Sequence, residues 1–237
     1  MRGLFVSTVL VAVLFVAGCG GSGGGGTSAT TQSSDLASKP ATAVVAAASK
    51  AADSASSVHV SGSGTDSGKS ISLDLTLAKG KGASGSISLN GASFDLILLG
   101  HTAYIKAGPA FWKKYGGPPA VAQLLENKWL KFSPNNKQLG PLTKIASPQS
   151  FFGLLKNHGK LANKGETTFK GQSVVAIDDT TQGGTLYVAA TGTPYPAGLV
   201  PGGGSETGAI TFDKWNEAVT LTAPKGALDF SGLNLNG

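Results

Sequence analysis

Three histidines and one pair of adjacent aspartates are the residues whose types could support acid–base chemistry. His59, His101 and His158 stand far apart, and none has the H-E-x-x-H or H-x-x-E-H spacing of a zinc-protease helix. Asp178 and Asp179 are neighbours, so on a strand they point to opposite faces and are expected to bracket a turn before the following Gly-Gly pair. We therefore predict no enzymatic activity, no metal site and no cofactor.

Two glycine-rich patterns match functional motifs only formally. Residues 80–85 read G-x-G-x-x-G, but they lie between alternating segments rather than at the start of a helix, so they predict a turn. Residues 20–24 match the G-x-S-x-G elbow of esterases without the required strand–turn–helix context. Neither pattern supports nucleotide binding or hydrolysis.

Cys19, the single cysteine, carries the strongest chemical signal in the chain. A short basic segment precedes an apolar run over 4–16, which is too short to span a bilayer. The run ends in Val-Ala-Gly-Cys19, which resembles a bacterial lipobox, in which the Cys thiol receives a diacylglyceryl group. We predict a lipoprotein signal peptide over 1–18 and anchoring through Cys19 to the extracytoplasmic face of the cell membrane. A plain signal peptide or an N-terminal membrane anchor is the alternative.

The composition narrows the class of partner. All but one of the 19 basic residues are lysines, and the exception is Arg2. Lysine lacks the planar fork with which arginine reads guanine edges, so sequence-specific nucleic-acid binding is not expected despite the net charge of +6. Glycine supplies 35 of the 237 residues and charged residues only 14%, which favours strands and turns over long exposed helices.

The chain is expected to consist of a tether and one folded domain. Residues 19–40 are rich in Gly, Ser and Thr, a composition typical of a flexible coil. A helix is predicted over 41–57, where small apolar residues share one helical face. Alternating apolar residues then predict an antiparallel meander of about five strands over 58–106, with an Asn-Gly hairpin turn. The domain is predicted to cover 41–237.

Helices and strands are both expected in the second half of the chain. Helices are predicted over 109–115 and 118–125 and from 147 through Leu155, and a strand is predicted over 127–132. Five further strands are predicted, at 165–170, 173–178, 185–190, 208–212 and 218–222.

A basic segment lies over residues 109–170, which hold ten lysines and two glutamates, a local balance of +8. A basic, aromatic-bearing segment on a tethered protein suits contact with anionic lipid headgroups. An ordinary solvated lysine surface explains the pattern equally well, and both interpretations stay open.

The most specific sequence pattern lies in the C-terminal third. Residues 208–219 read GAITFDKWNEAV, a strand followed by Phe-x-x-Trp-Asn, and a further segment ends in Ala-Pro at 223–224. With Ser57-Val58-His59, Ala103-Tyr104-Ile105-Lys106 and Lys128-Trp129-Leu130, this pattern resembles the actinobacterial LppX/LprAFG lipoproteins, which are similar to the LolA/LolB carriers.

The resemblance implies both a fold and a role. The implied fold is α+β: a curved antiparallel sheet, a half-open barrel, wraps around a few helices and encloses an apolar cavity. The implied role is to bind acylated lipids or lipoglycans and to carry or present them at the cell envelope, with a membrane transporter that loads or unloads the lipid as a further partner. The alternative is an envelope sensor or protein-interaction module, because LolA-like folds also serve in envelope-stress sensing.

Candidate site residues follow from strand alternation and from the resemblance. Six inward-facing aliphatic residues are expected either to line a cavity or to form ordinary core: Leu73, Leu75, Leu96, Leu98, Val188 and Ile210. Four aromatic residues of the helical section are expected to frame an entrance: Phe111, Trp112, Phe151 and Phe152. Trp215 and Asn216 are expected to fix a turn.

Overall fold

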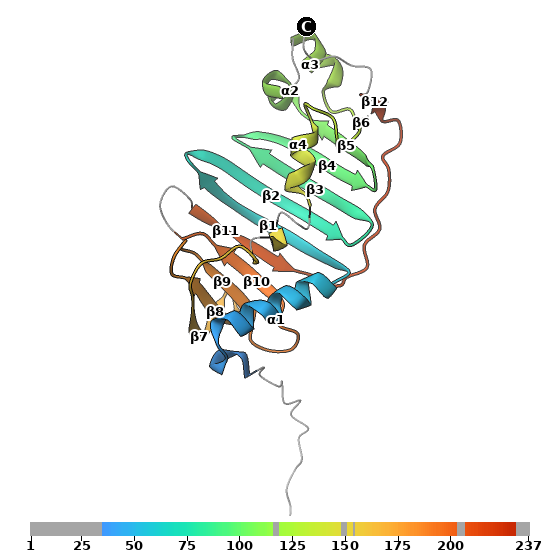
Figure 1. The fold of residues 1–237 in the computed structure, drawn as a ribbon. Helices are drawn as coiled ribbons and strands as arrows, with labels where there is room; N and C mark the ends of the chain where they lie inside the picture. Colours follow the sequence, from blue (N-terminus) through green and yellow to red (C-terminus); the bar gives the residue numbers. More distant parts are fainter. Residues whose placement is uncertain (1–34, 116–118, 148–150, 154, 203–206, 231–237) are drawn as a thin grey trace, which may run out of the picture. The chain divides into compact units, whose positions relative to one another are not determined.

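One twelve-stranded sheet organises the folded part of the chain (Figure 1). The structure is a computed structural model that describes residues 35–115, 119–147, 151–153, 155–202 and 207–230. The chain divides into two compact units, Met1–Thr30 and Thr31–Gly237, and the described residues all belong to the second. The strand order is β12-β6-β5-β4-β3-β2-β1-β11-β10-β9-β8-β7. The predicted signal peptide and Cys19 lie outside the described residues.

The first half of the sheet is the predicted meander. Its strands are β1 (Ser57–Asp66), β2 (Lys69–Ala78), β3 (Gly82–Leu89), β4 (Ala92–Leu99) and β5 (Thr102–Ala107). Each strand pairs antiparallel with the next, because alternating apolar residues and tight glycine turns keep sequence neighbours side by side. The G-x-G-x-x-G pattern begins in the turn between β2 and β3, as predicted, and its residues 82–85 continue into β3.

The second half is a further antiparallel meander that joins the first through β1. Its strands are β7 (Leu161–Phe169), β8 (Gln172–Asp179), β9 (Thr185–Ala189), β10 (Pro196–Val200) and β11 (Thr207–Asp213). β11 pairs antiparallel with β1, and this pairing joins the two halves into one continuous sheet. Sequence patterns predicted four of these strands; β10 was missed.

One predicted strand, at 218–222, is absent from the described sheet. Residues 218–222 alternate in polarity, but they pair with no strand among the described residues. β1 already pairs with β2 on one edge and with β11 on the other, so residues 218–222 find no free edge there and leave the sheet. The side chain of Lys81 donates a hydrogen bond to the carbonyl oxygen of Val219. The chain then reaches the far edge, where β12 (Leu228–Asp229) pairs parallel with β6 (Leu130–Phe132).

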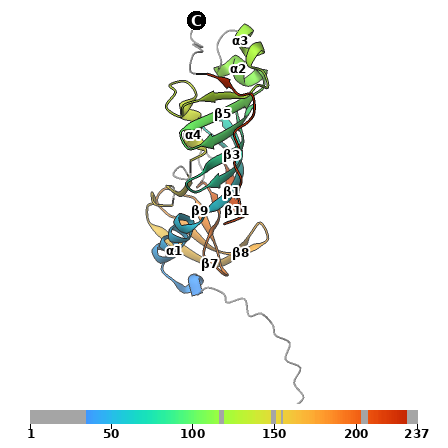
Figure 2. The ribbon, with the colours of Figure 1, turned by 90° about the vertical axis from the view of Figure 1, so that its right-hand side faces the viewer.

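Four α-helices are complete within the described residues. They are α1 (Ala41–Ser54), α2 (Pro109–Tyr115), α3 (Pro119–Leu125) and α4 (Gly140–Ile145). α1 and α4 lie on the same face of the sheet (Figure 2). Prediction missed α4. Of the helix predicted from 147, residues 151 and 152 are helical, whereas 148–150 and 154 lie outside the described residues.

The folded unit begins earlier than predicted. A 3₁₀ helix, η1 (Asp35–Ser38), buries Leu36 to 3% exposure, although residues 19–40 were assigned to the tether. The side chain amide of Asn163 on β7 donates to the carbonyl oxygens of Leu36, Ala37 and Lys39. One apolar side chain and one amide therefore attach this segment to the edge of the sheet.

Two clusters of buried side chains form the core. The larger cluster lies over β1–β6 and includes Phe111 and Trp112 of α2 and Leu125 of α3. The smaller cluster lies between α1 and strands β8 and β9 and includes Val44 and Leu186. Both clusters belong to the unit Thr31–Gly237, so this unit contains its own core and can be studied by itself.

Candidate functional site

A single row of residues crosses six neighbouring strands on the face that carries α1. Leu73 on β2 pairs with Gly62 on β1, and Gly62 pairs with Ile210 on β11. The row continues across β10, β9 and β8 through Leu199, Leu186 and Ile177. Because laterally paired residues share a face, these six positions form one apolar band.

Glycines leave the middle of this band, and the neighbouring row of β1 and β11, without side chains. Gly62 and Gly64 lie on β1, and Gly64 pairs with Gly208 on β11. A Cβ atom at Gly62 would overlap the carbonyl oxygen of Ala209, and one at Gly64 would overlap that of Thr207. The close approach of β1 to β11 therefore requires glycine, and the floor at this point is bare backbone.

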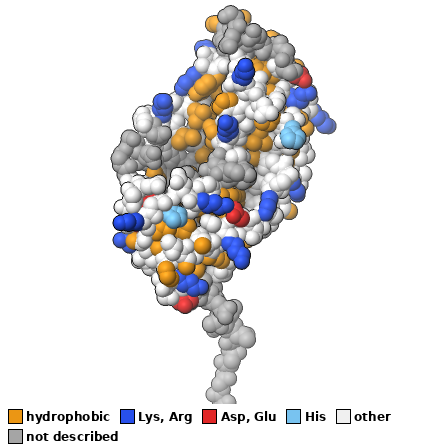
Figure 3. All heavy atoms as spheres, viewed as in Figure 1, with side chains coloured by type: hydrophobic (Ala, Val, Ile, Leu, Met, Phe, Trp, Pro, Cys, Tyr) orange, Lys and Arg blue, Asp and Glu red, His pale blue; other side chains and the backbone are white. Residues whose placement is uncertain are grey.

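A pocket of about 490 Å³, here called pocket 1, lies over this floor. All six residues of the band line it, and Val45 of α1 and Leu155 add apolar side chains from the smaller cluster. Leu73, Ile210 and Leu199 are only partly buried, although they pack against the larger cluster. Figure 3 shows hydrophobic side chains gathered on this face. Pocket 1 therefore lies over the part of the apolar band that neither core buries, from Leu73 to Leu199, whereas Leu186 and Ile177 belong to the smaller cluster. Its volume suits a small-molecule site.

Part of the lining of pocket 1 is polar. Its polar side chains include Asn157, His158, Asp179 and Gln182. The carboxylate of Asp179 accepts backbone N–H groups of Gln182, Gly159 and Thr181 at 2.7–2.8 Å. These hydrogen bonds, aided by the charge of His158, hold the pKa of Asp179 below its usual value. Asp179 thus fixes the β8–β9 turn, the role predicted for the aspartate pair.

The six predicted lining residues fall into different parts of the sheet. Leu73 and Ile210 line pocket 1. Leu75 and Leu96 lie in the adjacent cross-strand row and are fully buried in the larger cluster, against which Leu98 packs. Val188 is fully buried in the smaller cluster. Contact of any of these residues with a ligand stays a prediction.

The four predicted entrance residues are also divided. Phe111 and Trp112 have no exposed surface, and the indole Nε1 of Trp112 donates to the carbonyl oxygen of Ala107 at 3.1 Å. Phe151 is 5% exposed within the larger cluster. Phe152 is half-buried, packs against both clusters and lines a second pocket of about 390 Å³, here called pocket 2. The other three line neither pocket, and an entrance role stays a prediction.

Trp215 and Asn216 fix the chain after β11, as predicted. The side chain oxygen of Asn216 accepts the backbone N–H of Ser56 at 2.7 Å, and its amide donates to the hydroxyl of Tyr195 at 2.6 Å. The Trp215 ring stacks on Tyr195 with centroids 4.6 Å apart, and its Nε1 donates to the carbonyl oxygen of Pro196. These contacts join the α1–β1 connection to the start of β10.

Of the three histidines, His59 forms a specific cluster, which sequence reasoning did not predict. Its Nδ1 lies 2.6 Å from a carboxylate oxygen of Asp213 on β11, and its Nε2 lies 3.1 Å from one of Asp74 on β2. Partial burial lowers the pKa of His59, but the hydrogen bonds and charges of the two aspartates outweigh burial and raise it above its usual value. In the described part of the chain, no cluster of His, Cys, Asp and Glu is suited to hold a metal ion.

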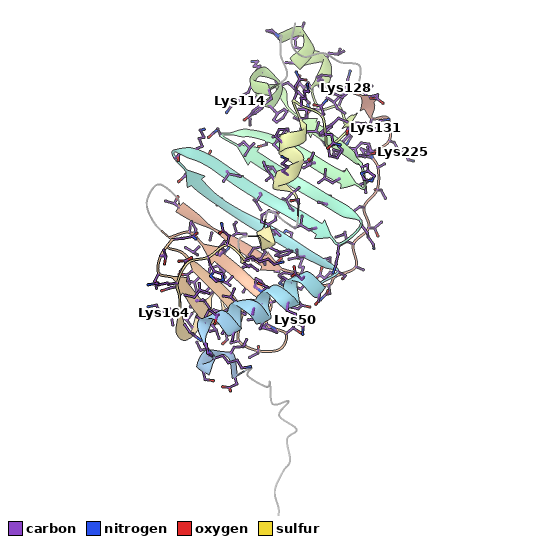
Figure 4. The ribbon with its side chains drawn as sticks, in the orientation of Figure 1. Lys50, Lys114, Lys128, Lys131, Lys164 and Lys225 are labelled. Atoms are coloured by element: carbon purple, nitrogen blue, oxygen red, sulfur yellow. The ribbon has the colours of Figure 1, made fainter. Side chains whose placement is uncertain are left out.

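The basic segment is continuous in sequence but divided in space. Lys114, Lys128 and Lys131 lie with Lys225 around α2, β6 and β12, whereas Lys164 lies on β7, at the opposite edge of the sheet (Figure 4). No helix among the described residues has the length and hydropathy to cross a membrane. The two groups of lysines can therefore be tested separately for contact with a lipid surface.

Comparisons with solved structures identify the fold. LprF from Mycobacterium bovis superposes with a TM-score of 0.57 at 15% sequence identity, covering 78% of this chain and 97% of that protein. The Mycobacterium tuberculosis lipoprotein LppX superposes with a TM-score of 0.53 at 19% identity, covering 80% of this chain and all of that protein. The fold is that of LprF and LppX. No protein-family model matches the sequence, and no curated protein matches it.

The shared fold confirms the predicted architecture. The described sheet is large, open and almost wholly antiparallel, and few helices pack on it, as the sequence resemblance to LppX/LprAFG proteins implied. At these low identities the likeness concerns the fold. The ligand and the partners of this chain have to be argued from its own residues.

Proposed function

We propose that this protein is a membrane-anchored lipoprotein that binds an acylated lipid or lipoglycan in pocket 1 and carries or presents it at the cell envelope. The observation that carries the proposal is the apolar band with its glycine floor, which is only partly buried from Leu73 to Leu199. The name of LppX as a lipoprotein and the lipobox-like Cys19 support the anchor. The proposed role needs no catalytic residue.

The size of the hydrophobic effect supports an acyl chain as the occupant. A buried methylene contributes about 0.8 kcal/mol, so about sixteen methylenes contribute roughly 13 kcal/mol before the costs of association. Those costs are at least about 4 kcal/mol. A long chain that enters pocket 1 is therefore expected to remain bound during purification, even without a charged partner for its headgroup.

Two leucine-to-tryptophan substitutions test this proposal as a matched pair. Leu73 lines pocket 1, whereas Leu96 has the same chemistry but lies in the closed row beside it. Leu73→Trp should fill pocket 1 and exclude lipid at little cost in stability. Leu96→Trp should overpack the core and lower the free energy of unfolding by about 1–3 kcal/mol while leaving lipid binding intact.

Native mass spectrometry of the unit Thr31–Gly237, followed by solvent extraction, measures the bound lipid. The proposal expects adducts heavier than a single fatty acid, of the mass of an acylated lipid or lipoglycan, in the parent and in Leu96→Trp, and their loss in Leu73→Trp. The carrier role would be refuted if the parent unit purified without such adducts and took up no fluorescent diacyl lipid, and if Leu73→Trp lowered stability as much as Leu96→Trp. That result would favour the interaction module instead.

A further inference from the structure

Pocket 2 is separate from pocket 1. Its floor consists of Ala52 and Ala55 at the end of α1, Val58 on β1 and Leu77 on β2, all buried. Residues 151–153 and 155–157 lie between the pockets: Leu155 lines pocket 1, whereas Phe152 and Lys156 line pocket 2. No described residue lines both, so the two sites can be changed independently.

One wall of pocket 2 is aromatic and held from several sides. The Trp215 ring lies between Tyr195 and Phe152, with centroid distances of 4.6 and 5.9 Å and interplanar angles of 8° and 29°. The hydrogen bond from Trp215 Nε1 to Pro196 fixes the indole further. This wall therefore presents a preformed apolar surface beside the aliphatic floor.

Two lysines converge at the edge of this apolar pocket. The ammonium group of Lys79 donates to the backbone carbonyl oxygen of Asp53 at 2.6 Å, and that of Lys156 pairs with the Asp53 carboxylate at 3.1 Å. An ammonium group has three N–H donors, and each of these contacts uses one of them. The side chains of Lys156 and Asp53 are 60% and 52% exposed, so their ion pair contributes little stability and can rearrange around a ligand.

We propose that pocket 2 binds a single-chain amphiphile with a carboxylate head, such as a long-chain fatty acid. Its chain would lie on the aliphatic floor against Trp215, and its carboxylate would accept hydrogen bonds from Lys79 and Lys156. Two lysines and one aspartate leave this edge with one net positive charge, which a monoanionic carboxylate balances. The proposal goes beyond the lipid proposed for pocket 1 and does not depend on it.

Fluorescence quenching at Trp215 tests the proposal. Bromine atoms quench a tryptophan only on close approach, so dibromostearate should quench the unit Thr31–Gly237 saturably, and Trp215→Phe should remove that component. The double variant Lys79→Gln/Lys156→Gln should weaken binding of the acid about tenfold or more, equivalent to about 1.4 kcal/mol. Lys50→Gln, on the exposed surface of α1, is the matched control and should leave the affinity unchanged.

Three comparisons decide the outcome. The uncharged methyl ester should bind more weakly than the acid and should be insensitive to the lysine substitutions. Ala52→Leu, which fills pocket 2, should abolish the quenching of Trp215, whereas Leu73→Phe in pocket 1 should not. Equal binding of acid and ester, an unchanged affinity in the lysine variant, quenching that survives Trp215→Phe, or stronger competition by a lysophosphatidate than by palmitate would overturn the proposal.

Discussion

Removal of the segment before Ala41 should destabilise the folded unit. The relevant comparison is between chains that begin at Thr31 and at Ala41. The shorter chain lacks η1 and with it Leu36, which is 3% exposed in the smaller core cluster. It also lacks the carbonyl groups that accept the Asn163 side chain. The tether assigned from composition would predict no difference between the two chains.

The expected loss can be worked out from these contacts. Replacing a buried leucine by alanine costs about 2–5 kcal/mol, and the lower end applies here because η1 lies at a sheet edge that can close over the gap. The Asn163 amide has two N–H donors for three carbonyl oxygens, so these hydrogen bonds contribute about 1–2 kcal/mol. Together they predict a loss of about 3 kcal/mol, or roughly 6–12 °C in Tm for a unit of this size.

Urea unfolding followed by circular dichroism measures this loss. Leu36→Ala in the longer chain should reproduce most of it. Leu124→Ala, at a leucine that is 57% exposed on α3, should change the free energy of unfolding very little. If the chain that begins at Ala41 matched the longer chain within about 0.5 kcal/mol, η1 would contribute nothing to the core, and the burial argument would be wrong.

Other predictions concern pH, the membrane and the anchor. Because the pKa of His59 is raised above 6.5 in the folded chain, its stabilising contribution is complete below that value and is lost as the pH rises through the folded pKa. In urea melts, His59→Gln should therefore lower the free energy of unfolding more at about pH 5.5 than at about pH 8. Vesicle sedimentation should show binding to anionic lipid that weakens as salt rises. Glutamine substitution at the α2–α3 end, of Lys113, Lys114 and Lys128, should weaken this binding. The same substitution at the β7 edge, of Lys160, Lys164 and Lys170, should not. Cys19→Ala should abolish lipid attachment in intact-mass measurements while the urea midpoint of the folded unit stays unchanged.

Sequence patterns predicted those elements whose partners are close in the chain. Strands β1–β5 follow from alternating residues and glycine turns because each strand pairs with the next. β10 was missed because it begins Pro196-Ala197-Gly198, which has low strand propensity, and its pairing with β9 is irregular between Pro196 and Gly198. α4 was missed because it begins with Gly140 and Pro141, residues more typical of a turn.

The candidate sites could be predicted only in part for the same reason. Alternation identifies Leu73 and Ile210 as inward-facing, but their shared row depends on the pairing of β1 with β11, which are distant in sequence. The spacing of Gly62 and Gly64, two residues apart on one strand, was an available sign of a missing side-chain row. Nothing local indicates that Lys79 and Lys156 meet at Asp53, because three separate elements bring them together.

The pairing of β1 with β11 also determines how the chain can assemble. Strands β1–β5 and β7–β11 are each built from sequence neighbours, so both meanders can form early, whereas the seam between them must wait for distant segments to meet. Until then β1 exposes a row of unpaired N–H and C=O groups along its length, and such an open edge is a template for another chain. We therefore expect the refolding yield to fall steeply as protein concentration rises, with aggregates that grow from half-assembled sheets rather than from the native surface.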